Sequence, residues 1–529
     1  MPVPGCGKAA RRLRCRPQVA IMKTPDFFRR AVSAGCCWLA LFLAVPTWAQ
    51  PTNYARSLPE LRAQLEAHLG QPRFGSALWG VKIVSLATGK TVYEHHADRL
   101  MSPASNSKLY AAALALATLG GDYQMATPIF ATAKASATGV LQGDLLISGR
   151  GDPSWNATNF WDNFAPFLAV LTNAGVRQVT GNLIADTTFF HTPRTGSGWS
   201  ADDLEDSEGA EISALTLADN TVQIRVTPGG KISAPGRLTL TLPDTGIVLV
   251  NRTRTIAAGG KKHLEVHKPL GANTFFVFGE LPLNAPAEWL DVPVPQPAAW
   301  FGAALKDALN RSGISIRGQV RVTAWPENPA PDTTHWMQLG EVKSPPLRTL
   351  IRAFLKPSQN LETDLVFDHT GEILRGSNAP AWETSEQSAV AALENFLATN
   401  GVPADLHFDE GSGLSRNNLT SANATVALLT MMATNRWAPD YFAALPIAGV
   451  DGTLRRRMKT TPAFQNVHAK TGTLRWVNAL SGYVTTAAGE RLVFSLLLNR
   501  YDPPANRKRT DELDAIANWL AGFAARTDE

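Results

Sequence analysis

Beyond residue 49 the sequence contains no cysteine. The chain has 529 residues and four cysteines, and all four (Cys6, Cys15, Cys36 and Cys37) lie within its first 37 residues. The rest of the chain therefore cannot form disulfide bonds, thiolate metal sites or a cysteine nucleophile. The 480 residues that remain are enough to bury more than one core without such cross-links.

Several motifs are also missing beyond residue 49. None of the ten histidines has His-Glu-x-x-His spacing, and there is no Gly-x-Gly-x-x-Gly or phosphate-loop lysine motif. No stretch reaches the roughly 18 consecutive apolar residues of a membrane-spanning helix. We therefore expect no metal, no nucleotide or other cofactor, and no transmembrane segment in this part of the chain.

Positive charge is concentrated at the N-terminal end. The whole chain has a net charge of +5, but residues 1–49 hold +7, which leaves −2 for the remainder. The remainder thus lacks the excess of basic residues that nucleic-acid binding requires, and no nucleic-acid partner is expected.

Residues 1–49 have the three parts of a secretory signal peptide. A basic region ends at Arg29-Arg30, an apolar run extends over 31–45, and Thr47-Trp48-Ala49 suits cleavage before Gln50. The apolar run is short for a membrane span, although an uncleaved anchor is the alternative. Export of a chain without disulfides indicates a bacterial periplasmic protein.

Strand-like and helix-like patterns occur at both ends, and short strand-like runs dominate the middle. This order predicts an α+β fold in which one domain, residues 50–126 and 341–529, is split by a β-rich insertion at 127–340 with two small lobes. Expected strands are 79–85, 91–93, 143–148, 181–186, 222–226, 237–242, 246–250, 274–278, 319–324, 480–485 and 491–498. Expected helices include 106–119, 163–174, 298–312, 386–399, 421–434 and 511–523.

Ser105 and Lys108 form a Ser-x-x-Lys motif at the start of an Ala/Leu-rich helix. Spacing of three residues places both side chains on one helical face. A serine hydroxyl needs a base to become a nucleophile, and a buried lysine can be that base when it is partly neutral. The alternative is an ordinary N-terminal serine with a surface lysine.

Lys470-Thr471-Gly472-Thr473 lies just before the expected C-terminal strand pair. Glycine allows a substrate to approach the backbone closely, and the threonine hydroxyls with the lysine ammonium are suited to bind a carboxylate. A simple turn is the alternative.

Ser-x-Asn occurs at least four times. Ser358-Gln359-Asn360 follows Pro357, which we expect to begin a helix that presents Ser358 and Asn360 near its N-terminus. Ser415 with Asn417 lies in a glycine-rich loop and is the rival candidate. The other two are Ser154/Asn156 and Ser421/Asn423.

The three motifs, in this order, resemble those of the penicillin-recognising serine enzymes. Four further segments resemble the D-alanyl-D-alanine carboxypeptidase/endopeptidase family typified by penicillin-binding protein 4, and the resemblance covers about residues 55–525. That family has a large insertion between its first two motifs, and Ser105 and Ser358 are 253 positions apart. The spacing to Lys470 favours Ser358 over Ser415. The four segments are 149–154, 181–186, 409–416 and 446–454.

The resemblance implies a penicillin-recognising domain, with an antiparallel sheet flanked by helices, that hydrolyses D-Ala-D-Ala peptides and D-amino-acid crosslinks of peptidoglycan and is acylated by β-lactam antibiotics. It implies Ser105 as nucleophile, Lys108 as its base, and Ser358 and Lys470 as a proton relay. Asn360 would hold the substrate amide. Gly472 lies between Thr471 and Thr473, which would bind the terminal carboxylate.

One position departs from the family, which usually has Ser-Asp-Asn where this chain has Ser-Gln-Asn. We expect Gln359 to point away from the substrate and activity to survive. A β-lactamase is an alternative function, although class A β-lactamases lack the insertion. A catalytically silent peptidoglycan-binding protein of the same fold is another.

Overall fold

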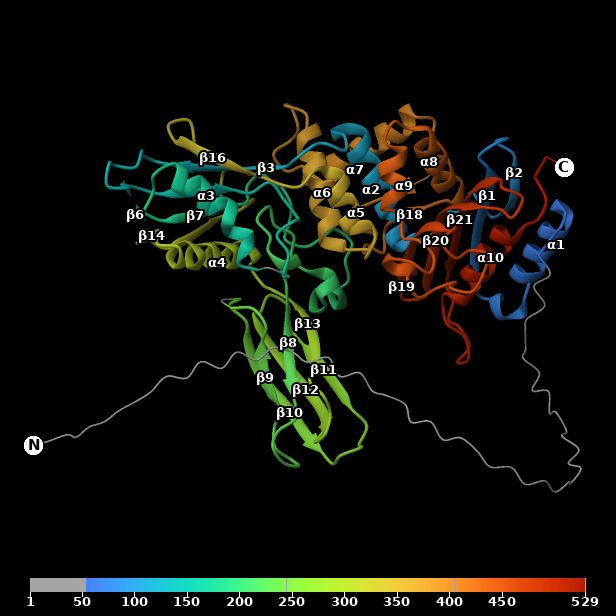
Figure 1. Cartoon of the computed structure of the whole chain (residues 1–529), viewed down its shortest axis with the longest axis horizontal. Helices are drawn as coiled ribbons and strands as arrows, with labels where there is room; N and C mark the ends of the chain where they lie inside the picture. The colour runs from blue at the N-terminus through green and yellow to red at the C-terminus, as the bar shows by residue number, and fades with distance from the viewer. Residues whose placement is uncertain (1–53, 159, 244, 404–405, 529) are drawn as a thin grey trace, which may run out of the picture. The chain divides into compact units, whose positions relative to one another are not determined.

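The computed structural model describes residues 54–158, 160–243, 245–403 and 406–528 (Figure 1). The expected signal peptide at 1–49 lies outside these residues. Within them, no helix combines the length and the apolar character that crossing a membrane requires.

A five-stranded antiparallel sheet joins both ends of the described chain, in the order β19-β20-β21-β1-β2. Strand β1 pairs with β21 from Leu78 opposite Asn499 to Ser85 opposite Leu492. The N-terminal strands thus complete a sheet whose other strands lie some 400 residues later. The strands are β1 (Leu78–Ser85), β2 (Thr91–His95), β19 (His468–Leu474), β20 (Val477–Thr485) and β21 (Arg491–Asn499).

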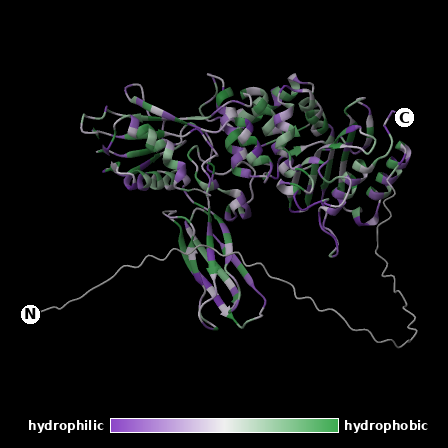
Figure 2. Ribbon diagram, viewed as in Figure 1, coloured by the Kyte–Doolittle hydropathy of each residue, from purple (hydrophilic) through white to green (hydrophobic). Residues whose placement is uncertain are grey.

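Helices cover both faces of this sheet, and apolar side chains alternate between two cores. Along β21, Phe494 and Leu496 pack with α1 and α10, whereas Val493 packs with the helices around α2. An extended strand directs successive side chains to opposite faces, so β20 and β21 are apolar in both directions (Figure 2). The helices are α1 (Leu58–Leu69), α2 (Ser107–Leu119), α5 (Leu347–Leu355), α6 (Asn360–Leu374), α7 (Ser385–Thr399), α8 (Ala422–Thr434), α9 (Ala438–Ala444) and α10 (Asp511–Gly522).

The chain between α2 and α5 begins and ends in a mixed sheet, in the order β15-β7-β5-β3-β16, with α3 and α4 packed into the same core. Its strands β5, β7 and β15 are parallel. Strands β4, β6 and β14 form a small sheet beside it. The elements are β3 (Ala126–Ala131), β4 (Val140–Leu141), β5 (Leu145–Ser148), α3 (Ala165–Asn173), β6 (Gln178–Val179), β7 (Leu183–Asp186), α4 (Pro297–Arg311), β14 (Ser315–Ile316), β15 (Val320–Thr323) and β16 (Met337–Lys343).

Two three-stranded sheets, β13-β8-β9 and β10-β12-β11, come from the middle of this stretch of the chain, between β7 and α4. The 3-10 turns η4 (Ala201–Glu205) and η5 (Ser207–Gly209) precede them in the chain. The strands are β8 (Thr221–Thr227), β9 (Arg237–Leu240), β10 (Val248–Ile256), β11 (His263–His267), β12 (Thr274–Pro282) and β13 (Glu288–Pro293); the short pair β17 (Leu406–His407) and β18 (Leu419–Thr420) lies further on.

The structure differs from the sequence predictions at several elements. Strands β3, β11, β13 and β16 were not predicted. Lys470–Thr473 precedes the predicted strand pair, now β20 and β21, but it also lies in a strand of its own, β19, where Lys470 is opposite Ser481. Pro357 does not begin a helix, because Ser358 has a φ of +73° and α6 begins at Asn360.

Two carboxyl groups meet where the insertion contacts α6. Glu362 of α6 and Asp219 of the insertion lie close enough for each to affect the titration of the other. Burial raises the pKa of both groups, and the charge of Asp219 raises the pKa of Glu362 further. The folded protein therefore holds a proton on this pair that the unfolded chain releases more readily.

This proton predicts a pH-dependent stability. Its contribution is complete below the ordinary carboxyl pKa of about 4.3 and is lost as the pH rises toward the raised folded-state pKa. We expect Glu362→Gln, which keeps a hydrogen-bond donor but cannot ionise, to lose about 1 kcal/mol less stability than the wild type between pH 5 and pH 8. Thermal unfolding at each pH measures this difference. Glu66→Gln, at an exposed position of α1, is the control, and parallel Tm curves for Glu362→Gln and wild type would contradict the assignment.

Candidate active site

Ser105 lies in a tight turn onto which two glycines allow other segments to pack. The turn η2 (Ala104–Asn106) precedes α2, and Ala104 has a φ of +46°. A Cβ atom on Gly413 would lie 2.0 Å from the Ala104 oxygen, and one on Gly472 would lie 2.5 Å from the Pro103 oxygen. The two glycines therefore bring a loop and strand β19 against the nucleophile.

Lys108 is fully buried beneath Ser105 and donates three hydrogen bonds. Its Nζ lies 3.0 Å from Ser105 Oγ, 2.6 Å from Asn360 Oδ1 and 2.6 Å from the Ser412 oxygen. Burial lowers the pKa of Lys108 to about 8, although the nearby carboxylates, Asp364 first, act to raise it. A lysine with this pKa is partly neutral near neutral pH, as a general base must be.

Lys470 is a second buried lysine, and its partner is Ser358. Lys470 Nζ donates to Ser358 Oγ at 2.7 Å and to the Thr471 oxygen at 2.8 Å. Burial, and then the charge of Lys108, hold the pKa of Lys470 well below its usual range. Ser415, the rival serine, instead donates to Asp409 Oδ2 at 3.2 Å. The structure therefore brings together Ser358, and not Ser415, with the lysine.

These residues surround one cleft of about 520 Å³. Lys108, Lys470 and Gly472 lie behind its wall. Strand β19 is an edge strand, so backbone groups on its outer side can bind a substrate, and Thr471 is held by a 2.8 Å hydrogen bond to Thr453. The cleft is lined by side chains that include Ser105, Ser358, Asn360, Thr471, Thr473, Arg416, Arg475, Asp202, Asp203, Asp206 and Glu208.

Two buried acids, Asp364 and Glu410, hold the loop that provides the Ser412 acceptor for Lys108. Asp364 accepts hydrogen bonds from the backbone N–H of Gly411 and Ser412, at 3.1 and 2.8 Å, and Glu410 accepts from that of Gly413 at 2.8 Å. These bonds hold the loop so that the Ser412 oxygen faces Lys108. Neither acid was predicted to have a role, although Asp364 lies one helical turn after Asn360.

Glu208 is the other residue that the sequence analysis missed. It belongs to the insertion, yet the Asn360 Nδ2 atom donates to Glu208 Oε2 at 2.9 Å and to the Glu208 backbone oxygen at 3.1 Å. No local pattern in the sequence could have placed this residue beside a motif 150 positions later.

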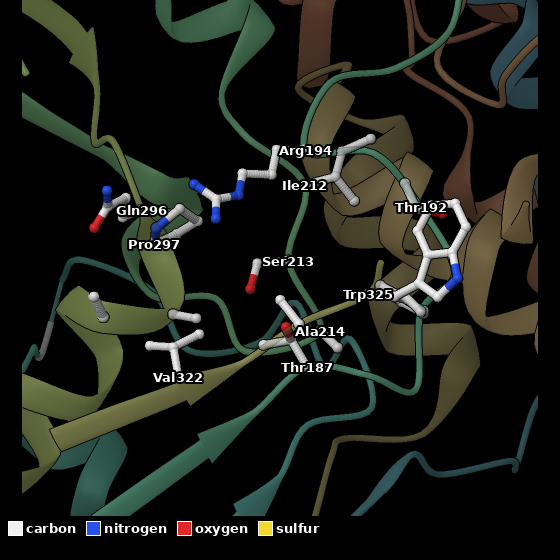
Figure 3. A pocket seen from close by; sticks show the side chains of 14 residues that line it. Thr187, Thr192, Arg194, Ile212, Ser213, Ala214, Gln296, Pro297, Val322 and Trp325 are labelled. Carbon is white, nitrogen blue, oxygen red and sulfur yellow. The ribbon is translucent and has the colours of Figure 1, made fainter. Parts of the chain in front are cut away.

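A second pocket lies apart from these motifs (Figure 3). The Arg194 guanidinium points toward Gln296 and Pro297 at the start of α4, and Trp325 closes the opposite side. Ser105, Ser358 and Lys470 do not line this pocket, so it has no part in their chemistry. Among the described residues, no three or more His, Cys, Asp or Glu side chains are grouped to hold a metal ion.

Comparison with known proteins agrees with this geometry. The model of the D-Ala-D-Ala carboxypeptidase 3 (S13) family matches residues 61–520. The chain belongs to this family. A D-alanyl-D-alanine carboxypeptidase of Actinomadura sp. (strain R39) is 35% identical over 482 residues, which cover 88% of this chain and 85% of the relative. The D-alanyl-D-alanine carboxypeptidase DacB of Haemophilus influenzae is 27% identical over 419 residues, 78% of this chain and 83% of that protein.

A solved structure shows the same fold. The crystal structure of penicillin binding protein 4 (dacB) from Haemophilus influenzae matches with a TM-score of 0.72 and 24% identity, covering 86% of this chain and 97% of that one. The predicted penicillin-recognising α+β fold is confirmed, and so is the predicted activity class. This S13 member is a serine-type DD-peptidase.

Gly472 offers a test of the packing around the nucleophile of this S13 enzyme. We expect Gly472→Ala to displace β19 from the Ser105 turn and to lower the rate of D-alanine release about 100-fold, as misplacement of a reacting group by about 1 Å does. The measurement is kcat/KM on a D-Ala-D-Ala peptide.

The matched control is Gly376→Ala, since a Cβ at Gly376 meets nothing within 4 Å. We expect its kcat/KM to stay within about twofold of wild type, the range of a surface substitution. Full activity in Gly472→Ala would show that the close approach to Pro103 is not required.

Proposed function

We propose that this enzyme hydrolyses D-Ala-D-Ala termini and D-amino-acid crosslinks of peptidoglycan through an acyl-Ser105 intermediate. The observation that supports this most directly is the 3.0 Å hydrogen bond between Lys108 Nζ and Ser105 Oγ, with the lysine buried and its pKa lowered to about 8. A serine paired with a partly neutral lysine is an activated nucleophile.

The acylation step follows from this pair. Ser105 Oγ bonds to the substrate carbonyl carbon while its proton passes to Lys108. The backbone N–H groups of Ser105 and of Thr473, on the edge strand, stabilise the oxyanion. The bond to the leaving D-amino acid then breaks, and its nitrogen takes a proton from Ser358, which is resupplied by Lys470 through their 2.7 Å hydrogen bond. Water afterwards hydrolyses the ester.

The remaining cleft residues bind substrate in this proposal. Thr471 and Thr473 receive the terminal carboxylate, and Gly472 keeps their strand close to the nucleophile. Asn360 is assigned to the substrate amide, but both of its N–H groups donate to Glu208. Asn360 therefore binds the substrate amide in exchange for one of these two hydrogen bonds, while the other continues to orient its carboxamide.

We infer two further properties. A β-lactam acylates Ser105, because the four-membered lactam carbonyl occupies the position of the scissile amide; a β-lactam complex of the Haemophilus influenzae relative supports this. The enzyme acts in the periplasm on peptidoglycan stem peptides, which the basic and apolar pattern of residues 1–49 supports.

Ser105→Ala tests the nucleophile. We expect this variant to fold, to take up no labelled penicillin, and to release neither D-alanine nor monomers from crosslinked dimers in purified peptidoglycan. Ser102→Ala is the neighbouring control, and we expect it to be labelled like the wild type.

Each alternative has its own result. Covalent labelling of Ser105→Ala would refute the assignment. Rapid hydrolysis of penicillin by the wild type would indicate a β-lactamase, and peptidoglycan binding without labelling or D-alanine release would indicate a silent binding protein.

The pKa of Lys108 sets the expected pH dependence. The neutral amine of Lys108 is the active form, so kcat/KM for D-alanine release should rise about tenfold per pH unit below the pKa of about 8. The rate should fall again where Lys470, the proton source for the leaving group, loses its own proton. Initial rates from pH 5.5 to 9 measure this profile. A rate that is flat between pH 6 and 8 would exclude Lys108 as the base.

A further inference from the structure

Among the described residues of the insertion, Glu208 has a side chain that accepts a hydrogen bond from a residue of the three motifs, Asn360. It lies in η5, in a segment braced by its own contacts: Ser200 and Asp203 form a capping box, and a Cβ on Gly209 would lie 2.2 Å from the Asp203 oxygen. The segment is therefore held in one conformation that directs Glu208 into the cleft.

The contact determines how the Asn360 carboxamide is oriented. Its nitrogen donates twice to Glu208, at 2.9 and 3.1 Å, so its oxygen faces Lys108 Nζ at 2.6 Å. The reversed orientation would place an oxygen against a carboxylate and N–H groups against an ammonium group. Glu208 thus excludes the orientation in which Lys108 loses an acceptor.

The charge of Glu208 also acts on both buried lysines. Lys108 and Lys470 repel each other, and Glu208 is the carboxylate that stabilises the charged form of both. Other acidic groups also lie near Lys108 and Glu208. Asp364 and Glu410 face Lys108, and Asp206 faces Glu208. Further charges on the cleft wall are Asp202, Asp203, Arg416 and Arg475.

We propose that Glu208 is a positioning residue of this active site, whose carboxylate orients Asn360 toward Lys108 and whose charge offsets the repulsion between Lys108 and Lys470. This inference rests on the proposed function, in which Lys108 acts as a base and Lys470 as an acid. It gives the insertion a direct part in catalysis.

Two substitutions separate the two effects. Glu208→Gln keeps an oxygen that accepts the Asn360 hydrogen bond and removes only the charge, whereas Glu208→Ala removes both. The measurement is the second-order rate constant for acylation by fluorescent penicillin from pH 5.5 to 10, since this constant reports the groups of the free enzyme.

For Glu208→Gln, loss of the negative charge lowers the pKa of both lysines. Lys108 then becomes neutral at lower pH and Lys470 loses its proton at lower pH. We expect the rising and the falling limb of the pH–rate profile both to shift to lower pH by about one unit. The maximum rate should stay within about threefold of that of the wild type. The ratio of variant to wild-type rates should fall steadily from pH 6 to pH 9.

For Glu208→Ala, the limbs should move similarly and the maximum should fall about tenfold, because the Asn360 carboxamide is no longer held. Asp202→Asn removes a charge from the same wall that does not act on the pKa of Lys108 or Lys470, and it should shift the limbs of the profile less than half as far.

The outcomes distinguish this inference from the proposed function. If the wild type is not acylated by penicillin, the proposed function fails. If it is acylated and Glu208→Gln lowers the rate equally at all pH values, Glu208 has only a structural role. Limbs that stay in place in both Glu208 variants would overturn the inference while leaving the nucleophile assignment intact.

Discussion

The burial of two ammonium groups side by side is the constraint on which the rest of this active site depends. Lys108 and Lys470 are both fully shielded from solvent, and each charge buried without partners would cost several kcal/mol. The fold offsets this cost with acceptors at short distance: Ser105, Asn360 and the Ser412 oxygen for one lysine, Ser358 and the Thr471 oxygen for the other. These acceptors do not fully offset the cost of burying the ammonium group of Lys108, so its pKa is only about 8. This lowered pKa makes the site reactive.

Four separate segments supply these acceptors, and this explains the organisation of the chain. The turn η2 supplies Ser105 next to Lys108 of α2, the start of α6 and the residues before it supply Asn360 and Ser358, the 410–413 loop supplies Ser412, and β19 supplies Thr471 beside Lys470. The insertion separates Ser105 from Asn360 in the sequence. Glu208 of the insertion nevertheless contacts Asn360 in the active site. An insertion placed here is thus able to affect the chemistry without altering the sheet that carries it.

The sequence allowed the motifs to be found from their local spacing, and the resemblance that they carry implied the penicillin-recognising fold with its antiparallel sheet. The three-residue spacing of Ser105 and Lys108 places them together, and the continuous apolar runs of β20 and β21 indicate strands buried on both faces. What escaped prediction depends on contacts distant in the chain. Nothing in the segment around Glu208 distinguishes it from other acidic residues. Its role follows only from its contact with Asn360 in the folded chain. Ser358 departs from the predicted helix because its left-handed conformation turns its hydroxyl toward Lys470.

The same reasoning accounts for the unusual middle residue of the second motif. Gln359 is absent from the cleft lining, and its Oε1 accepts from the Asn360 N–H at 2.9 Å. Burial raises the pKa of Asp219, and the Gln359 side chain acts to lower it. Burial and the charge of Asp219 also raise the pKa of Glu362. An aspartate at position 359, usual in the family by resemblance, would add a third carboxyl group near this pair, whereas a neutral glutamine adds no charge. The glutamine therefore suits the acidic pair beside the insertion, and it leaves the Ser358–Lys470 contact intact.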